Sequence, residues 1–120
     1  LDSNLCNYAQ QWANHLANTG EMEHRSQNNY GENLFMSAGM QVDGRTAVKA
    51  WYDEIKFYKY GSDFSPSTGH FTQVVWKDTK QLGCAFARKG HFVYIVANYH
   101  PPGNYRGRFP ENVLPPKKFN

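Results

Sequence analysis

Cysteine is scarce in this chain, which has two, Cys6 and Cys84, among 120 residues. Two thiols cannot build the framework of several disulfides that holds many small secreted domains together. One long-range bridge between them is possible, and two buried free thiols are at least as compatible with the sequence. Cysteine usage therefore excludes a disulfide scaffold and leaves the compartment open.

Long apolar runs and a strong charge of one sign are also missing. No stretch approaches transmembrane length, and the chain starts with neither a signal peptide nor Met, so we interpret it as a mature, trimmed or truncated piece. The formal charge of +3 is small and dispersed, which argues against nucleic acid as a partner and permits an anionic lipid. With 40% hydrophobic and 16% aromatic residues, we expect one folded domain over residues 1–120.

Residues 1–20 are predicted to form a helix. Asp2 or Ser3 could cap its start, and Gly20 could end it. Its apolar residues recur at helical spacing, and they are Leu5, Tyr8, Ala9, Trp12, Ala13 and Leu16.

A second helix is predicted over residues 46–58, capped by Thr46 or Asp43. Its apolar side comprises Val48, Trp51, Tyr52, Ile55 and Tyr58. The residues Val48, Tyr52 and Lys56 also fit a loose cholesterol-contact pattern, which matches many ordinary helices and carries little weight alone.

Two runs rich in β-formers, residues 82–87 and 92–99, flank a short turn and predict an antiparallel hairpin. The second run lacks polar alternation, so we expect a central strand covered on both faces. Pro101 should end this strand because proline cannot donate to a ladder. The remaining residues, to Asn120, are expected to form an irregular coil.

Residues 69–77 are the most informative stretch. Phe71, Val74 and Val75 suit one face of a short helix, but the β-branched pair would equally suit a strand. Taken alone, His70 is best read as a bystander. His24, Glu32 and Glu54 are equally unconvincing one by one: His24 lies in a polar loop, Glu32 opens an apolar run, and Glu54 flanks a helix.

Three segments resemble the signatures of the CAP superfamily, the cysteine-rich secretory, antigen-five and pathogenesis-related proteins. Gly-His-Phe-Thr-Gln-Val-Val-Trp at 69–76 resembles the first, and Tyr-Ile-Val-Ala-Asn-Tyr-His-Pro-Pro-Gly-Asn-Tyr at 94–105 resembles the second. Gly-Glu-Asn-Leu at 31–34 is similar to a third, shorter one. The resemblance spans nearly the whole chain. It implies an α+β fold, an α-β-α sandwich with a central antiparallel sheet between helical layers, and it supports the helical reading of residues 69–77.

The sequence departs from the family pattern in two places. The family normally begins with a further helix that this sequence lacks. If that helix is truly absent, part of the core is uncovered, which favours either a homodimer or instability. Ala97 stands where most secreted members have a cysteine, while Cys84 matches a family cysteine whose usual partner is not evident. The low cysteine count and Glu-Asn-Val-Leu-Pro-Pro at 111–116 look more like the Golgi-associated branch, which binds membranes peripherally. Some invertebrate members with a similar tail are secreted, so both localisations stay open.

The resemblance places four polar residues in one cleft: His24, Glu32, Glu54 and His70. Two neutral imidazoles, those of His24 and His70, could ligate Zn²⁺ or another divalent metal. Glu32 and Glu54, the candidates for a catalytic role, could orient the imidazoles or poise a bound water. Nothing in the sequence positions a nucleophile beside a base; the loop serines are Ser62, Ser65 and Ser67.

Three functions are compatible with these residues. The favoured one is a binding protein for lipids or sterols at a membrane surface, with no cofactor required, supported by the resemblance, the aromatic residues within 51–60, and the cations Lys117 and Lys118. Its low-weight contact residues would be Val48, Tyr52 and Lys56. The first alternative is a zinc-assisted hydrolase or protease using the four cleft residues. The second is a secreted defence, venom-like or signalling factor that acts through a protein partner, which rests on analogy alone.

Overall fold

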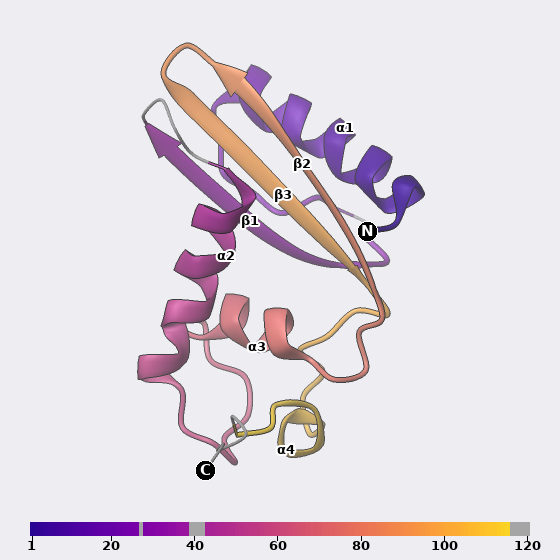
Figure 1. The fold of residues 1–120 in the computed structure, drawn as a ribbon, viewed down its shortest axis with the longest axis vertical. Helices are drawn as coiled ribbons and strands as arrows, with labels where there is room; N and C mark the ends of the chain where they lie inside the picture. The colour runs from indigo at the N-terminus through magenta and orange to yellow at the C-terminus, as the bar shows by residue number, and fades with distance from the viewer. Residues whose placement is uncertain (27, 39–42, 116–120) are drawn as a thin grey trace.

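The structure, a computed structural model, describes residues 1–26, 28–38 and 43–115. Its centre is an antiparallel sheet in the order β1-β3-β2, made of β1 (Gly31–Ala38), β2 (Gln81–Lys89) and β3 (Phe92–His100) (Figure 1). The predicted hairpin is confirmed, because β2 pairs with β3. The strand β3 ends at His100, directly before Pro101, as the missing proline N–H requires.

Helices cover both faces of this sheet, which confirms the predicted α+β sandwich (Figure 1). Side chains alternate along β3: Tyr94 and Val96 pack with α1 (Ser3–Thr19), whereas Val93, Ile95 and Ala97 pack with α2 (Gly44–Tyr52). Every residue from 93 to 99 is buried. The absence of polar alternation in this run therefore has the predicted cause, burial on two faces.

The helix α1 begins and ends where its sequence indicates. The Asp2 carboxylate accepts a hydrogen bond from the Leu5 backbone N–H at 2.9 Å, and Gly20 ends the helix with a left-handed φ of 72°. The helix lies very close to β2 at Gly83, where an added Cβ would lie 2.2 Å from the Leu5 carbonyl carbon. Glycine is required there because any side chain would push the helix off the sheet.

The predicted helix over residues 46–58 is wrong in its length and partly wrong in its buried face. The helix α2 starts at Gly44, with Asp43 as its cap, and passes at Asp53 into the 3₁₀ helix η1 (Asp53–Phe57). Tightening of the last turn is common where a helix leaves its packing surface. Val48 and Tyr52, expected on the apolar side, are 43% and 40% exposed.

The stretch around His70 is a helix, α3 (Gly69–Val75), which packs against α2 and η1. The tail is not wholly coil, since α4 (Phe109–Asn112) forms a short turn beside α3. These elements share a third cluster, which contains Tyr58, Phe71, Trp76, Phe109 and Val113. Lys117 and Lys118 lie outside the described residues. No helix in the described part of the chain is long and apolar enough to cross a membrane.

Candidate functional site: a cleft with two histidine–glutamate pairs

The strand β1 builds the site by sending neighbouring side chains to opposite faces of the sheet. Leu34 packs with α1 and Phe35 with the α2 side, so Glu32 shares the face of Leu34 and Asn33 that of Phe35. Glu32 reaches the loop that carries His24. The Asn33 amide donates to the His70 carbonyl at 3.2 Å, which joins β1 to the start of α3.

The Glu32 carboxylate is almost completely buried, at 3% exposed, and accepts four hydrogen bonds. Its Oε1 accepts from the Arg25 backbone N–H at 2.9 Å and pairs with His24 Nδ1 at 3.0 Å. Its Oε2 accepts from the side-chain amides of Asn28 at 3.1 Å and Asn98 at 3.2 Å. These bonds saturate the carboxylate and fix the His24 loop against the sheet.

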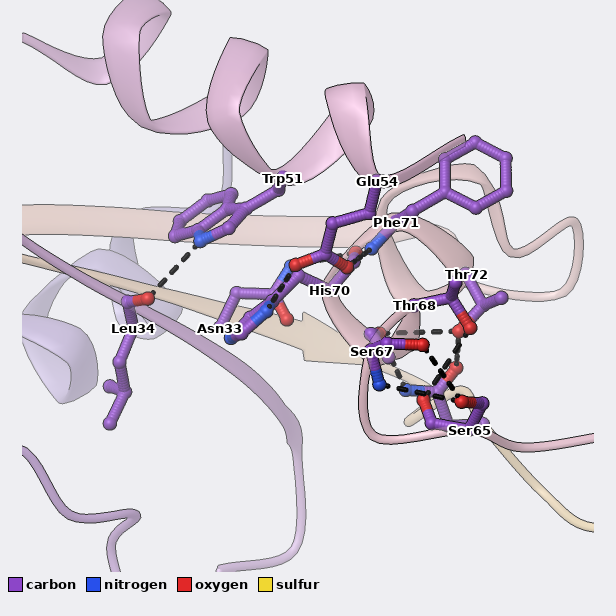
Figure 2. Close-up of polar contacts among 12 residues, drawn as sticks. Asn33, Leu34, Trp51, Glu54, Ser65, Ser67, Thr68, His70, Phe71 and Thr72 are labelled. Atoms are coloured by element: carbon purple, nitrogen blue, oxygen red, sulfur yellow. Dashed lines mark hydrogen bonds and ion pairs between the residues drawn. The ribbon is translucent and has the colours of Figure 1, made fainter. Parts of the chain in front are cut away.

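Glu54 holds the second histidine, His70, in a similar way. Its Oε2 pairs with His70 Nδ1 at 2.8 Å, and its Oε1 accepts from the Phe71 backbone N–H at 3.0 Å (Figure 2). The Trp51 ring stacks against the His70 imidazole at 6.2 Å between centroids and is itself held by a bond from its Nε1 to the Leu34 carbonyl at 3.1 Å. The 3₁₀ geometry of η1 carries Glu54 to this position.

His24, Glu32 and His70 line one cavity of about 260 Å³. Glu54 is not part of the lining and lies behind His70. The sequence reasoning missed the other lining residues, which are Asn33, Phe64, Pro66, Gly69 and Asn104. Of these, Asn33, Gly69 and Asn104 belong to the quoted signatures, so the signatures could have pointed to them. The loop residues Phe64 and Pro66 carry no such signal.

Asn104 fixes the wall of the cleft beside α3. It has a left-handed φ of 62°, its Nδ2 donates to the Gly69 carbonyl at 2.9 Å, and its Oδ1 accepts from Thr72 Oγ1 at 2.6 Å. Asparagine is among the residues that tolerate this backbone conformation. The segment after β3 is thus tied to the first turn of the helix that carries His70.

Both histidines line the cleft, and each is paired through its Nδ1 with a glutamate. In the tautomer that donates Nδ1–H to its glutamate, each histidine keeps the Nε2 lone pair available for a ligand. Among the described residues no group of three or more His, Cys, Asp or Glu side chains could hold a metal ion. The metal site that the sequence predicts at His24 and His70 therefore stays a prediction.

Electrostatics distinguish His24 from an ordinary surface histidine. The hydrogen bond with Glu32 raises the pKa of His24 above its usual 6.5, partial burial opposes this, and the negative charge of Glu32 adds to the rise. A ligand that needs the neutral imidazole must therefore compete with a proton at higher pH than at a free histidine.

A nucleophile activated by a base is not present among the described cleft residues. Ser65 and Ser67 are hydrogen-bonded to each other at 3.0 Å, and the Ser62 hydroxyl donates to the Lys59 carbonyl. Neither histidine is paired with a hydroxyl in these contacts. The arrangement suits binding through two imidazoles better than it suits covalent catalysis.

Together, these features define a class: an α-β-α sandwich with two carboxylate-oriented histidines in a polar cleft beside α3. The chain belongs to the CAP family, the cysteine-rich secretory protein family, whose model matches residues 1–99.

Two curated relatives and one solved structure illustrate the similarity. The basic form of pathogenesis-related protein 1 from Nicotiana tabacum is 41% identical over 122 residues, covering 99% of this chain and 68% of that protein. The Golgi-associated plant pathogenesis-related protein 1 from Homo sapiens is 43% identical over 126 residues, covering 98% of this chain and 80% of that protein. The crystal structure of NaASP2 with Zn²⁺ superposes with a TM-score of 0.68 at 31% identity, over 83% of this chain and 60% of that one.

Proposed function

We propose that this CAP domain is a binding protein whose cleft takes a divalent metal ion, Zn²⁺ in the first instance, through Nε2 of His24 and His70. The observation that supports the proposal is the matched pairing of each Nδ1 with a glutamate, because a metal-binding histidine usually donates its other N–H to a carboxylate or carbonyl. Two imidazoles leave coordination positions of Zn²⁺ open for an outside ligand. The similar NaASP2 structure is described as containing Zn²⁺.

Calorimetric titration with zinc chloride tests this proposal. His24→Ala and His70→Ala should each weaken zinc binding at least about tenfold, because one of two protein ligands is lost. His91→Ala, which removes an exposed histidine at the β2–β3 turn, is the matched control and should bind like the parent chain. Zinc binding that survives in both cleft variants would refute the proposal.

The contacts of the two carboxylates argue against the alternative function, a zinc-assisted hydrolase. Glu32 is saturated by four donors and Glu54 is held by two, so neither carboxylate is placed to accept a proton from a water in the cleft. We therefore rank binding above catalysis. Zinc-dependent turnover of a peptide or ester panel that disappears in a folded Glu54→Gln variant would reverse this ranking.

A second function, contact with a lipid surface, is supported by the exposed side of α2 and η1. Val48 and Tyr52 lie one turn apart on α2, and Lys56 follows in η1; these three exposed residues are here called the α2 stripe. Phe57, the next residue, is 70% exposed. The stripe is flanked by exposed cations, which are Arg45, Lys49 and Lys59. Exposed apolar side chains surrounded by positive charge are typical of surfaces that rest on anionic membranes.

Vesicle flotation tests the lipid surface separately from the metal. The Val48→Ser/Tyr52→Ser double variant should lose binding to vesicles of phosphatidylserine and phosphatidylcholine, with or without sterol. Phe92→Ser removes a similarly exposed apolar side chain at the start of β3 and should leave binding unchanged. If the parent chain floats with none of these vesicles, the lipid function is refuted while the zinc experiment stands.

A further inference from the structure

A second concave site lies away from the cleft, where the segments after α3 and β3 meet α4. It is a groove of about 650 Å³ and shares no lining residue with the cleft. Three short hydrogen bonds hold its parts together: the backbone N–H groups of Lys77 and Asp78 each donate to Asn112 at 3.0 Å, and Lys80 donates to the His100 carbonyl at 3.0 Å. The groove is therefore a fixed feature of the fold.

The indole of Trp76 marks this groove as a binding site. Trp76 is only 4% exposed, yet its Nε1–H donates to no described residue, and it is not one of the fully enclosed polar atoms that lack a partner. The Nε1 atom is therefore not fully enclosed, and Trp76 is one of the residues that line the groove. The other two tryptophans donate to carbonyls, Trp12 to Glu23 at 2.9 Å and Trp51 to Leu34 at 3.1 Å. A buried indole N–H normally has a partner, so the groove offers a donor to an incoming acceptor.

The groove lining is positively charged, which would attract an acceptor that carries negative charge. Its lining holds three cations, Lys80, Arg106 and Arg108, against one carboxylate, Asp78. Among the described residues, Lys80 Nζ donates only to the Lys77 carbonyl, at 3.1 Å, and Arg106 forms no ion pair. Arg108 forms an ion pair with Glu111, with 3.6 Å between Nη1 and Oε2. The groove therefore carries positive charge that the described residues do not neutralise.

Part of the groove lining is apolar. Pro101 and Pro102 form one part of the lining, and Tyr105, which is 56% exposed, forms another. A free phosphate group would use the cations and leave these rings uncovered. An extended peptide would use both, since aromatic-lined grooves accept proline and aromatic side chains.

We propose that this groove binds an acidic segment of a protein partner, in which an aromatic or proline residue packs on Tyr105 and the two prolines. Carboxylates of the segment pair with Lys80, Arg106 and Arg108, and one acceptor oxygen takes the Trp76 N–H. The last residues of this chain include Lys117 and Lys118, so their charge has the wrong sign for this groove. The site is independent of metal in the cleft.

The three indole N–H signals in a ¹H–¹⁵N spectrum give a direct test. The probe is the capped peptide Asp-Glu-Tyr-Pro-Asp-Glu, and Trp76→Phe assigns the Trp76 signal. Titration should shift this signal in a saturable way, whereas the signals of Trp12 and Trp51 should stay in place because both donors already have partners. The same peptide with lysine at every acidic position should shift none of them. An unmoved Trp76 signal up to millimolar acidic peptide overturns the proposal.

Charge reversal separates the groove from general attraction to a basic protein. Lys80→Glu and Arg108→Glu should each weaken binding about five- to tenfold, because an attraction becomes a repulsion. Lys89→Glu, at another exposed cation at the end of β2, should change binding less than about twofold. Equal loss in all three variants overturns the proposal. So does a Trp76 shift produced by inositol hexakisphosphate or a heparin oligosaccharide but not by the acidic peptide, since it would assign a phosphate or sulfate ligand.

Discussion

Glu54 holds His70 at two adjacent points of the chain, through the imidazole Nδ1 at 2.8 Å and through the backbone N–H of the next residue at 3.0 Å. Glu32 repeats this pattern with His24 and the N–H of Arg25. Each carboxylate thus sets the position of the histidine backbone and the direction of the ring. A loop, which carries His24, and a helix, which carries His70, reach the same local geometry because one side chain satisfies both requirements.

Glu54→Gln is expected to keep the fold and lose the metal. The new amide can still accept from Phe71 through its oxygen, but its NH₂ faces His70 Nδ1, which must then accept a hydrogen bond. The ring proton moves to Nε2 and removes the lone pair from the cleft. We expect at least about tenfold weaker zinc binding, a stability change of about 1 kcal/mol, and ¹⁵N shifts that report Nε2–H at His70. Unchanged zinc binding would contradict the assigned role of Glu54.

Glu32→Gln is expected to cost more stability, because its side chain is more buried and has donors on both oxygens. Either orientation of the new amide places its NH₂ against at least one donor, the Arg25 N–H on one side or the Asn28 and Asn98 amides on the other. We expect a loss of about 2–3 kcal/mol in the free energy of unfolding, measured with urea. Glu21→Gln, at an exposed glutamate, is the control and should stay within about 0.5 kcal/mol.

The change of folding stability with pH should follow the protonation of His24. Its pKa in the folded chain is raised above 6.5, chiefly by the hydrogen bond with Glu32. The contribution of the protonated pair to stability is therefore fully present below the unfolded pKa of about 6.5 and is lost as the pH rises through the higher folded pKa. Zinc binding should change in the opposite sense and weaken as the pH falls through the same range.

An NMR titration of the His24 ring measures this directly. The parent chain should titrate above 6.5, and Glu32→Gln should bring the value down because the ring loses its charged partner. His91, exposed at the β2–β3 turn, serves as the internal reference signal. A His24 ring that titrates at or below 6.5 in the parent chain would disprove the pairing with Glu32.

The local patterns of this sequence predicted the β2–β3 hairpin and the first helix, but neither the strand β1 nor the cleft. The two-sided strand β3 and the caps of α1 follow from burial and from the chemistry of Asp2 and Gly20, which short-range reasoning captures. No periodicity predicts that Glu54 meets His70 or that Glu32 meets His24, because those contacts depend on where α3 and the His24 loop pack. The four residues could be grouped only through the family resemblance.

The boundary between α2 and η1 shows a second limit. An apolar pattern over residues 46–58 fits one continuous helix, but the chain tightens at Asp53 and leaves Val48 and Tyr52 exposed. The spacing of apolar residues shows where the apolar side of a helix is, but it does not separate two apolar residues that lie next to each other on that side. Here Trp51 and Tyr52 are neighbours in sequence, and only the packed sheet decides that Trp51 is the buried one.

The contact of α1 with β2 predicts a strong effect of one methyl group. In Gly83→Ala the new Cβ would lie 2.2 Å from the Leu5 carbonyl carbon and 2.5 Å from the Cys6 nitrogen, both backbone atoms that move only with the helix. We expect a loss of about 3 kcal/mol or more in the free energy of unfolding. Gly44→Ala, with no atom within 4 Å of its added Cβ, is the control and should be neutral or slightly stabilising. Equal effects of the two substitutions would contradict the close contact.

The two cysteines should remain free thiols under mild oxidation, even though they are neighbours. The Cys84 backbone N–H lies 3.4 Å from Cys6 Sγ, but the Cys84 side chain packs with the cluster on the α2 face, whereas α1 lies on the other face of the sheet. A disulfide needs two Cβ atoms that face each other, so the sheet itself blocks the bridge. Burial also raises the pKa of the Cys84 thiol, so iodoacetamide at neutral pH should modify it much more slowly in the folded chain than in urea. Non-reducing peptide mapping after treatment with oxidised glutathione should find no peptide that links the two residues, and finding one would show that Cys84 can leave its face of the sheet.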